Sequence, residues 1–283
     1  MKTKIAILTD SSSSIYNVKD RAENIFMLNS PAYIGEEMFT DFEKNLDAPF
    51  YEALEKATVI PRTSQPSVGE TLEMFNHIKS LGYTDVIYLP ISKALSGTYQ
   101  NGHMAKEMVE GINITIVDTM TTVSILAAMT LEASRLANAG LSVSEIVEKI
   151  TILRANSKFF AAVKDLTALI KNGRLSNAKG FVANLFNIRP VLHMTDDGRI
   201  VGLKNVRTFN NALKACIELI EEGLDQENGE IHLLYTKNTD DMEYTKSLLI
   251  ERFPKTPIKV FTLPSTVVAH IGLESIAIGF INY

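Results

Sequence analysis

The sequence predicts an α/β protein of two domains. Residues 1–155 are expected to form a three-layer α/β domain around a parallel sheet, and residues 156–283 an α+β domain with antiparallel strands, with any ligand held between or within them. In the first half, short apolar runs alternate with helical patterns, which is typical of a parallel sheet covered by helices. Near residue 155 this rhythm changes, and an Asp-Gly pair between two apolar runs predicts an antiparallel hairpin. The length of 283 residues suits two domains of about 100–200 residues each.

The first half begins with an apolar run at residues 4–10, which predicts a buried strand followed by the hydroxyl-rich loop SSSS. The clearest helix starts at Ser67, which forms a capping box with Glu70, and it closes at Gly82. Its apolar residues recur at three- and four-residue steps, as in an amphipathic helix. Further strands are expected at residues 25–33, 84–89 and 112–117, and further helices at 124–139 and 144–155.

The second half is expected to start with a hairpin. Apolar runs at residues 188–194 and 199–206 flank the sequence TDDG, and Asp-Gly is a strong signal for a tight turn. The rest of the half predicts a helix at 210–222, a strand at 231–235, a helix at 240–253 and strands at 258–263 and 275–283.

Composition and charge exclude several classes of protein. The 28 basic and 33 acidic residues give a net charge of −5 with no basic block, which disfavours a nucleic-acid partner. The most apolar stretch, residues 125–133, is far short of the ~20 residues that span a bilayer, so no stable membrane insertion is expected. The apolar run 5–8 is too short for a secretory signal, and the single Cys216 suits a reducing compartment. Both observations favour a cytoplasmic protein.

Several common catalytic and cofactor motifs are missing, and a match to S-x-x-K at residues 176–179 lacks its partner motifs. The sequence has no phosphate-binding glycine loop, no H-E-x-x-H or C-x-x-C metal motif and no G-x-S-x-G elbow. We therefore expect no cofactor, no metal and no assigned catalytic residue.

Three hydroxyl-rich segments follow predicted strands or precede predicted helices, at residues 9–14, 63–67 and 92–98. Ligands of open parallel sheets bind at the carboxyl ends of the strands, where helix N-termini present free N–H groups. The segments therefore suit a small anion. Helix capping explains each of them equally well, because Ser and Thr are preferred caps.

At these segments the sequence resembles the DegV family. TDSSSSI, TSQPSVGE, LSGTYQNG, LIKNGRLS, NIRPVL with DDGRI, and AHIG occur in the family's order and spacing. The resemblance makes residues 3–282 a single unit of the DegV type. Members bind long-chain fatty acids, and the FakB proteins among them present the fatty acid to a kinase subunit, FakA, which phosphorylates the carboxylate with ATP. The resemblance thus implies a lipid-binding, substrate-presenting subunit of a two-component kinase, with no chemistry of its own.

The resemblance also implies which residues hold the carboxylate. Thr63, Ser96 and His270 occupy the family's contact positions, and hydroxyls can satisfy a carboxylate in an apolar slot. Arg174 and Arg207 lie in family motifs and are expected to meet the carboxylate, the transferred phosphoryl group or the kinase subunit, unless they are surface charges. The neighbours Ser64, Gly97 and Thr98 complete the predicted fatty-acid-binding set. Residues 270–274 (HIGLE) depart from the Gly-Pro-Gly-like run that usually follows the family's histidine.

Candidate segments for the acyl chain are residues 159–163, 181–185, 191–194 and 276–281, although each is equally expected in an ordinary core. Two other functions stay open at this point. One is an esterase or acyl-transferase that uses Ser96 with His270. The other is a carrier of a different small hydrophobic acid.

Overall fold

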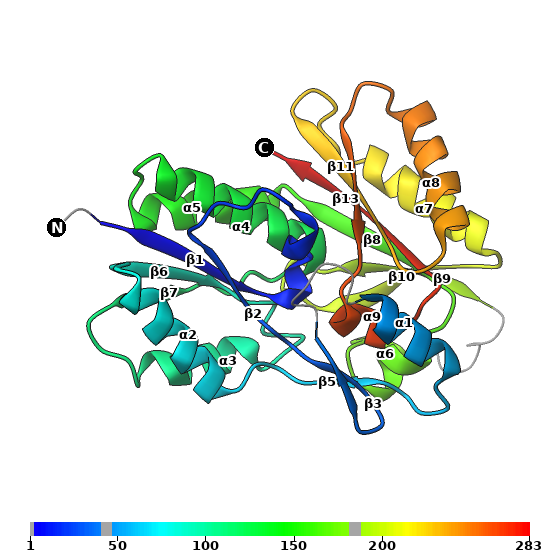
Figure 1. Cartoon of the computed structure of the whole chain (residues 1–283). Helices are drawn as coiled ribbons and strands as arrows, with labels where there is room; N and C mark the ends of the chain where they lie inside the picture. Colours follow the sequence, from blue (N-terminus) through cyan, green and yellow to red (C-terminus); the bar gives the residue numbers. More distant parts are fainter. Residues whose placement is uncertain (1–2, 41–46, 181–187) are drawn as a thin grey trace.

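The computed structural model describes residues 3–40, 47–180 and 188–283 (Figure 1). Its N-terminal part contains a four-stranded parallel sheet in the order β2-β1-β6-β7, as the sequence predicts. The strands are β1 (Ile5–Asp10), β2 (Ile25–Leu28), β6 (Asp85–Leu89) and β7 (Asn113–Ile116).

Helices cover both faces of this sheet (Figure 1). Because side chains alternate along a strand, Ala6 and Leu8 pack with Phe75 and the helices of one face, while Ile7 packs with Leu126 on the other. The predicted capping box of Ser67 and Glu70 is confirmed. The helices are α2 (Val68–Ser80) and α3 (Thr98–Lys106) on one side, and α4 (Val123–Asn138) and α5 (Val143–Ala155) on the other.

The prediction of a single strand over residues 25–33 is wrong. After β2 the chain leaves the parallel sheet at Ser30 and Pro31, where proline cannot donate to a strand ladder. The following residues form β3 in a separate small sheet of order β4-β3-β5. Its strands are β3 (Ala32–Ile34), β4 (Glu37–Phe39) and β5 (Arg62–Thr63), and the helix α1 (Asp47–Lys56) lies in the chain between β4 and β5.

The C-terminal part holds a six-stranded mixed sheet of order β10-β9-β8-β13-β11-β12, and among its described strands only β11 and β12 pair in parallel. The predicted hairpin is present and turns at Gly198. The strands are β8 (Lys158–Val163), β9 (Arg189–Met194), β10 (Ile200–Val206), β11 (Gly229–Tyr235), β12 (Ile258–Thr262) and β13 (Ser275–Asn282).

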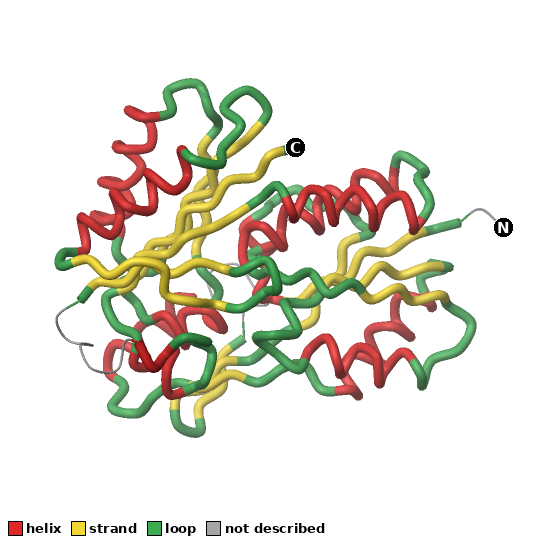
Figure 2. The backbone as a smooth tube through the Cα atoms, turned by 180° about the vertical axis from the view of Figure 1, so that it is seen from behind, coloured by secondary structure: helices red, strands yellow, loops and turns green. Residues whose placement is uncertain are grey.

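Two long helices, α7 (Phe209–Glu221) and α8 (Thr239–Arg252), cover one face of the mixed sheet (Figures 1 and 2). On its other face, Ala277 and Ile281 of β13 share one hydrophobic core with Leu126 and Met129 of α4. The core therefore continues from one sheet to the other, and the domain boundary near residue 155 stays a prediction.

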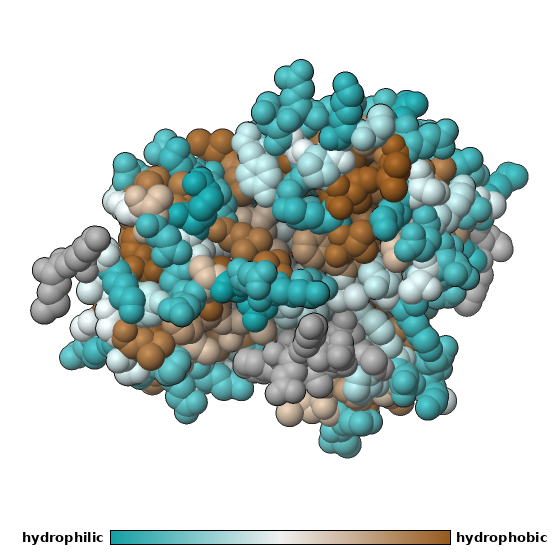
Figure 3. All heavy atoms as spheres, turned by 45° about the horizontal axis from the view of Figure 1, so that its top comes forward, coloured by the Kyte–Doolittle hydropathy of each residue, from teal (hydrophilic) through white to brown (hydrophobic). Residues whose placement is uncertain are grey.

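Two short helices, α6 (Thr167–Lys171) and α9 (Ser265–Ile271), contact each other beside the small sheet. Cys216 of α7 is buried, and burial raises the pKa of its thiol to about 12. On the face shown in Figure 3, hydrophobic patches are interrupted by hydrophilic side chains, as on most globular surfaces. Within the described ranges no helix has the length and apolarity needed to cross a bilayer.

Candidate functional site

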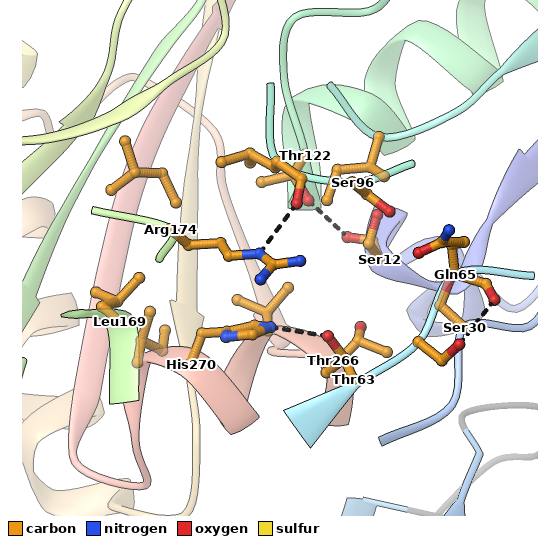
Figure 4. A pocket seen from close by; sticks show the side chains of 16 residues that line it. Ser12, Ser30, Thr63, Gln65, Ser96, Thr122, Leu169, Arg174, Thr266 and His270 are labelled. Atoms are coloured by element: carbon orange, nitrogen blue, oxygen red, sulfur yellow. Dashed lines mark hydrogen bonds between the residues drawn. The ribbon is translucent and has the colours of Figure 1, made fainter. Parts of the chain in front are cut away.

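A cavity, called the central cavity below, lies between the carboxyl ends of β1 and β6 and the helices α6 and α9 (Figure 4). Its volume is about 80 Å³, and it opens partly to solvent. One part of its wall is apolar and the rest is polar. The apolar residues are Ile91, Leu95, Leu169, Ile200, Val267 and Ile271, and the polar residues are Ser12, Ser30, Thr63, Ser64, Gln65, Ser96, Thr122, Arg174, Thr266 and His270.

His270 and Thr63 form the first polar contact of the central cavity. The Nε2 atom of His270 lies 2.9 Å from Oγ1 of Thr63, and Nδ1 lies 3.2 Å from the side-chain nitrogen of Asn172. Burial, with a smaller contribution from the Arg174 charge, lowers the pKa of His270 to about 4. The ring is therefore neutral at neutral pH and can donate from only one nitrogen.

Arg174 contributes a positive charge to the central cavity. Its Nε donates to the backbone oxygen of Leu95 at 3.2 Å, and its Nη1 donates to the backbone oxygen of Asn172. In the described part of the chain, no carboxylate lies within 4.0 Å of this guanidinium. Figure 4 shows the group pointing between Ser96 and His270. A partly buried cation without an acidic partner favours an anionic ligand.

Ser96 and Thr98 are paired with each other. Their hydroxyls lie 2.8 Å apart, and the N–H of Thr98 donates to Oγ of Ser96 at 3.3 Å. Thr98 is buried, so it positions Ser96 and does not line the central cavity. The absence of a side chain at Gly97 makes room for Gln65, because a Cβ there would come within 2.7 Å of the Gln65 amide nitrogen.

Asp10 connects the ends of β1 and β6 beside the central cavity. It is fully buried and accepts hydrogen bonds from the backbone N–H of Ser12 at 3.0 Å, from the Ser12 hydroxyl, and from the N–H of Ile91 at 2.7 Å. Burial raises the pKa of this carboxyl, and these hydrogen bonds oppose the rise. The carboxylate thereby fixes two residues of the cavity wall.

The β9–β10 hairpin docks on the same loops. Ser92 donates to the backbone oxygen of Gly198 at 2.8 Å, and Arg154 donates to the carbonyls of Met120 at 3.1 Å and Asp196 at 2.9 Å. Gly198 has a φ of +81°, and a Cβ there would come within 2.9 Å of the Met120 Cα. These contacts join the hairpin, which carries Ile200 into the cavity wall, to the ends of the parallel strands.

The structure brings five of the predicted site residues into one cavity wall: Thr63, Ser64, Ser96, Arg174 and His270. Gly97 and Thr98 lie directly beside Ser96, but they are outside the described lining. Arg207 is exposed between β10 and α7 and does not line the central cavity either. Its predicted contact with a partner stays a prediction.

The described segments that were expected to contact the acyl chain lie outside the central cavity. Residues 159–163, 191–194 and 276–281 belong to β8, β9 and β13, and the buried ones form the sheet core and do not line the central cavity. Residues 181–185 lie outside the described residues. Asp10 and Ser12 lie in the predicted hydroxyl-rich segment 9–14, whereas Asn172 and Thr266 lie outside all three such segments.

Comparison with known proteins identifies the family. The model of the DegV family, whose members are described as uncharacterised proteins, matches residues 4–283. A DegV domain-containing protein of Streptococcus pneumoniae is 30% identical over 278 residues, covering 98% of this chain and 99% of the relative. The chain belongs to the DegV family. The resemblance found in the sequence is thereby confirmed.

Solved DegV structures have the same fold. A fatty acid binding DegV family protein from Streptococcus agalactiae superposes with a TM-score of 0.91 at 28% identity, covering 99% of both chains. The fatty acid kinase (Fak) B3 protein of Streptococcus pneumoniae, loaded with linoleic acid, gives 0.85 at 22% identity, covering 99% of this chain and 100% of that one. DegV from Bacillus subtilis, a fatty acid binding protein, gives 0.86 at 23% identity with the same coverage. The predicted fold, a parallel sheet followed by a mostly antiparallel one, is confirmed.

Proposed function

We propose that this DegV protein binds a long-chain fatty acid, holds its carboxylate with Thr63, Ser96, His270 and Arg174, and presents it to a separate kinase subunit. The observation that carries the proposal is the guanidinium of Arg174, which lies in a partly apolar cavity without a carboxylate partner among the described residues. A carboxylate there would pair with the guanidinium and accept hydrogen bonds from the neighbouring hydroxyls.

The apolar wall explains why the anion should carry a chain. Each buried CH₂ contributes roughly 0.8 kcal/mol, so a chain of about fifteen would contribute on the order of 12 kcal/mol before the costs of association. A neutral hydrogen bond adds only about 1 kcal/mol net. The chain therefore determines affinity, while the polar end orients the carboxylate and discriminates against esters.

The family relationship supports the same ligand, because a relative with a TM-score of 0.91 at 28% identity is a fatty acid binding protein. The presenting role and a cytoplasmic location are parts of the same proposal, and the fatty acid kinase (Fak) B3 protein is an example of this fold in a fatty acid kinase. In this proposal the exposed Arg207 contacts the kinase subunit, since arginine suits acidic or phosphorylated partners.

The contacts in the central cavity disfavour a serine hydrolase. A nucleophilic serine needs a base within hydrogen-bond distance. Here the Ser96 hydroxyl pairs with Thr98, and Nε2 of His270 pairs with Thr63. A carrier of a different hydrophobic acid would bind its ligand with the same side chains. Only the identity of the bound ligand distinguishes that function from fatty-acid binding.

Native mass spectrometry of protein purified without added lipid tests the ligand directly, with a fatty-acid adduct as the expected result. In binding assays, Arg174→Gln should weaken the affinity for a fatty acid by roughly 10- to 100-fold, because a hydrogen-bonded charge is worth about 1.5–3 kcal/mol. The affinity for the methyl ester should change much less. Arg252→Gln, on the exposed face of α8, is the matched control. Equal losses for acid and ester would defeat the proposed head-group site.

The presenting role has its own test. The double variant Thr63→Ala with Ser96→Ala should reduce acyl-phosphate formation with the cognate kinase more than it reduces lipid retention, because the chain supplies most of the affinity. Equal reduction of both would contradict this division of roles.

A further inference from the structure

The side chain of Asn172 lies between a backbone carbonyl and the His270 ring. Its nitrogen Nδ2 is 3.1 Å from the backbone oxygen of Pro61 and 3.2 Å from Nδ1 of His270. A carbonyl oxygen can only accept a hydrogen bond, so the amide must turn its NH₂ group, and not its oxygen, toward Pro61. The same NH₂ has a second hydrogen, which is directed at Nδ1.

This arrangement determines where the ring proton lies. An imidazole nitrogen that accepts a hydrogen bond cannot carry a proton, so the proton of the neutral ring is on Nε2. Nε2 lies 2.9 Å from Oγ1 of Thr63 and therefore donates to it. The Thr63 hydroxyl then keeps its own hydrogen for another acceptor.

We propose that Asn172 is a positioning residue that sets the His270 ring proton on Nε2 and thereby makes the Thr63 hydroxyl a donor to the bound ligand. The opposite tautomer would reverse the contact: Thr63 would donate to Nε2, and its lone pairs would face the ligand. Lone pairs repel a carboxylate, so only the first arrangement suits an anion.

The backbone around Asn172 keeps this side chain in place. Asn172 ends α6, with its N–H donating to Ala168 at 2.9 Å, and Gly173 then takes a φ of +69°. The next residue, Arg174, donates to the backbone oxygen of Asn172. One short turn thus places both the amide that orients the ring and the guanidinium that faces the anion.

The ring proton can be located by NMR of the protein with ¹⁵N-labelled histidine, at about pH 9, where imidazoles are neutral. The native protein should show His270 protonated on Nε2. In Asn172→Asp, a carboxylate that can only accept should move the proton to Nδ1. Asn101→Asp is the matched control, since the Asn101 amide also donates to a proline carbonyl, that of Pro66 at 2.8 Å, but orients no histidine. A native ring protonated on Nδ1, or an unchanged ring in Asn172→Asp, would overturn the proposal.

The consequence for binding rests on the proposed function and is measured separately. Asn172→Leu, which removes the amide without adding a charge, should weaken fatty-acid affinity by up to about fivefold, corresponding to one lost hydrogen bond. In a Thr63→Val background the same substitution should have little further effect, because the hydroxyl it acts through is gone. Additive losses would refute the role of Thr63. Absence of fatty-acid binding by the native protein would instead defeat the proposed function, while the NMR result would still decide the position of the ring proton.

Discussion

The two sides of the central cavity are built from different chemical groups. The side formed by the parallel sheet supplies neutral hydroxyls, such as Ser12 and Ser96, on loops that are held by the buried Asp10. The side formed by α6 and α9 supplies a charge and a ring, Arg174 and His270. The hydroxyls of the first side lie on loops that directly follow strands, so the strand ends are enough to position them. On the second side, the charge of Arg174 selects an anionic ligand and the His270 ring determines the direction of the hydrogen bonds. Both of these side chains must themselves be oriented by neighbouring groups.

Loosening the β9–β10 hairpin from the parallel-sheet side should have the largest effect. The backbone oxygen of Gly198 in this hairpin accepts a hydrogen bond from Ser92, and a Cβ at Gly198 would come within 2.9 Å of the Met120 Cα. In Gly198→Ala the added methyl group would overlap Ser92, and the φ of +81° at this position is unfavourable for alanine. We therefore expect the free energy of unfolding, measured by urea titration, to fall by about 2–4 kcal/mol. Gly35→Ala, at a φ of +60° with open space around it, should cost only about 1 kcal/mol. Equal costs at both positions would show that the hairpin contact does not matter.

Lowering the pH should have a smaller effect on stability, and this effect arises from His270 on the side formed by α6 and α9. The unfolded His270 ring takes up a proton below about pH 6.5, whereas the folded ring does so only near pH 4. The stability of the empty protein is therefore full above pH 6.5 and falls as the pH is lowered toward 4. Between pH 7 and pH 4.5 the native protein should lose on the order of 2 kcal/mol more than His270→Gln. Parallel pH profiles would contradict the lowered pKa.

The smallest expected effect concerns Thr266, one turn before His270 on α9. Its buried hydroxyl lines the central cavity and has no hydrogen-bond partner in the described structure. Thr266→Val should therefore raise the free energy of unfolding of the empty protein slightly, by up to about 1 kcal/mol, and weaken fatty-acid affinity about fivefold. Thr130→Val removes a hydroxyl that donates to Leu126 at 2.8 Å, so it should lower stability and leave affinity unchanged. A destabilised empty Thr266→Val protein would show that this hydroxyl already has a partner.

The same difference between the two sides explains what could be predicted from the sequence. Thr63 and Ser96 could be found because hydroxyls next to strands and helix starts form a local pattern. The tight turn at Gly198 and the capping box at Ser67 are local as well, and both are confirmed. The family resemblance added His270, which has no local signal of its own.

Asn172 and Thr266 could not be found in this way. Each lies on or at the end of a helix of five or seven residues, too short to give a hydrophobic period. The partners of Asn172 are about 100 residues away in the sequence, since it contacts both Pro61 and His270. The strand β8 was overlooked for another reason: both its faces are buried, so its apolar run lacks the alternation of a half-exposed strand.

The single cysteine gives this protein a built-in reporter of unfolding. Cys216 is buried with a thiol pKa of about 12, so alkylating reagents, which need an accessible thiolate, should not modify it in the native state. Its rate of labelling would measure how often the α7 region opens. A second cysteine introduced at an exposed position could then carry a fluorophore alone, with no need to remove the natural one.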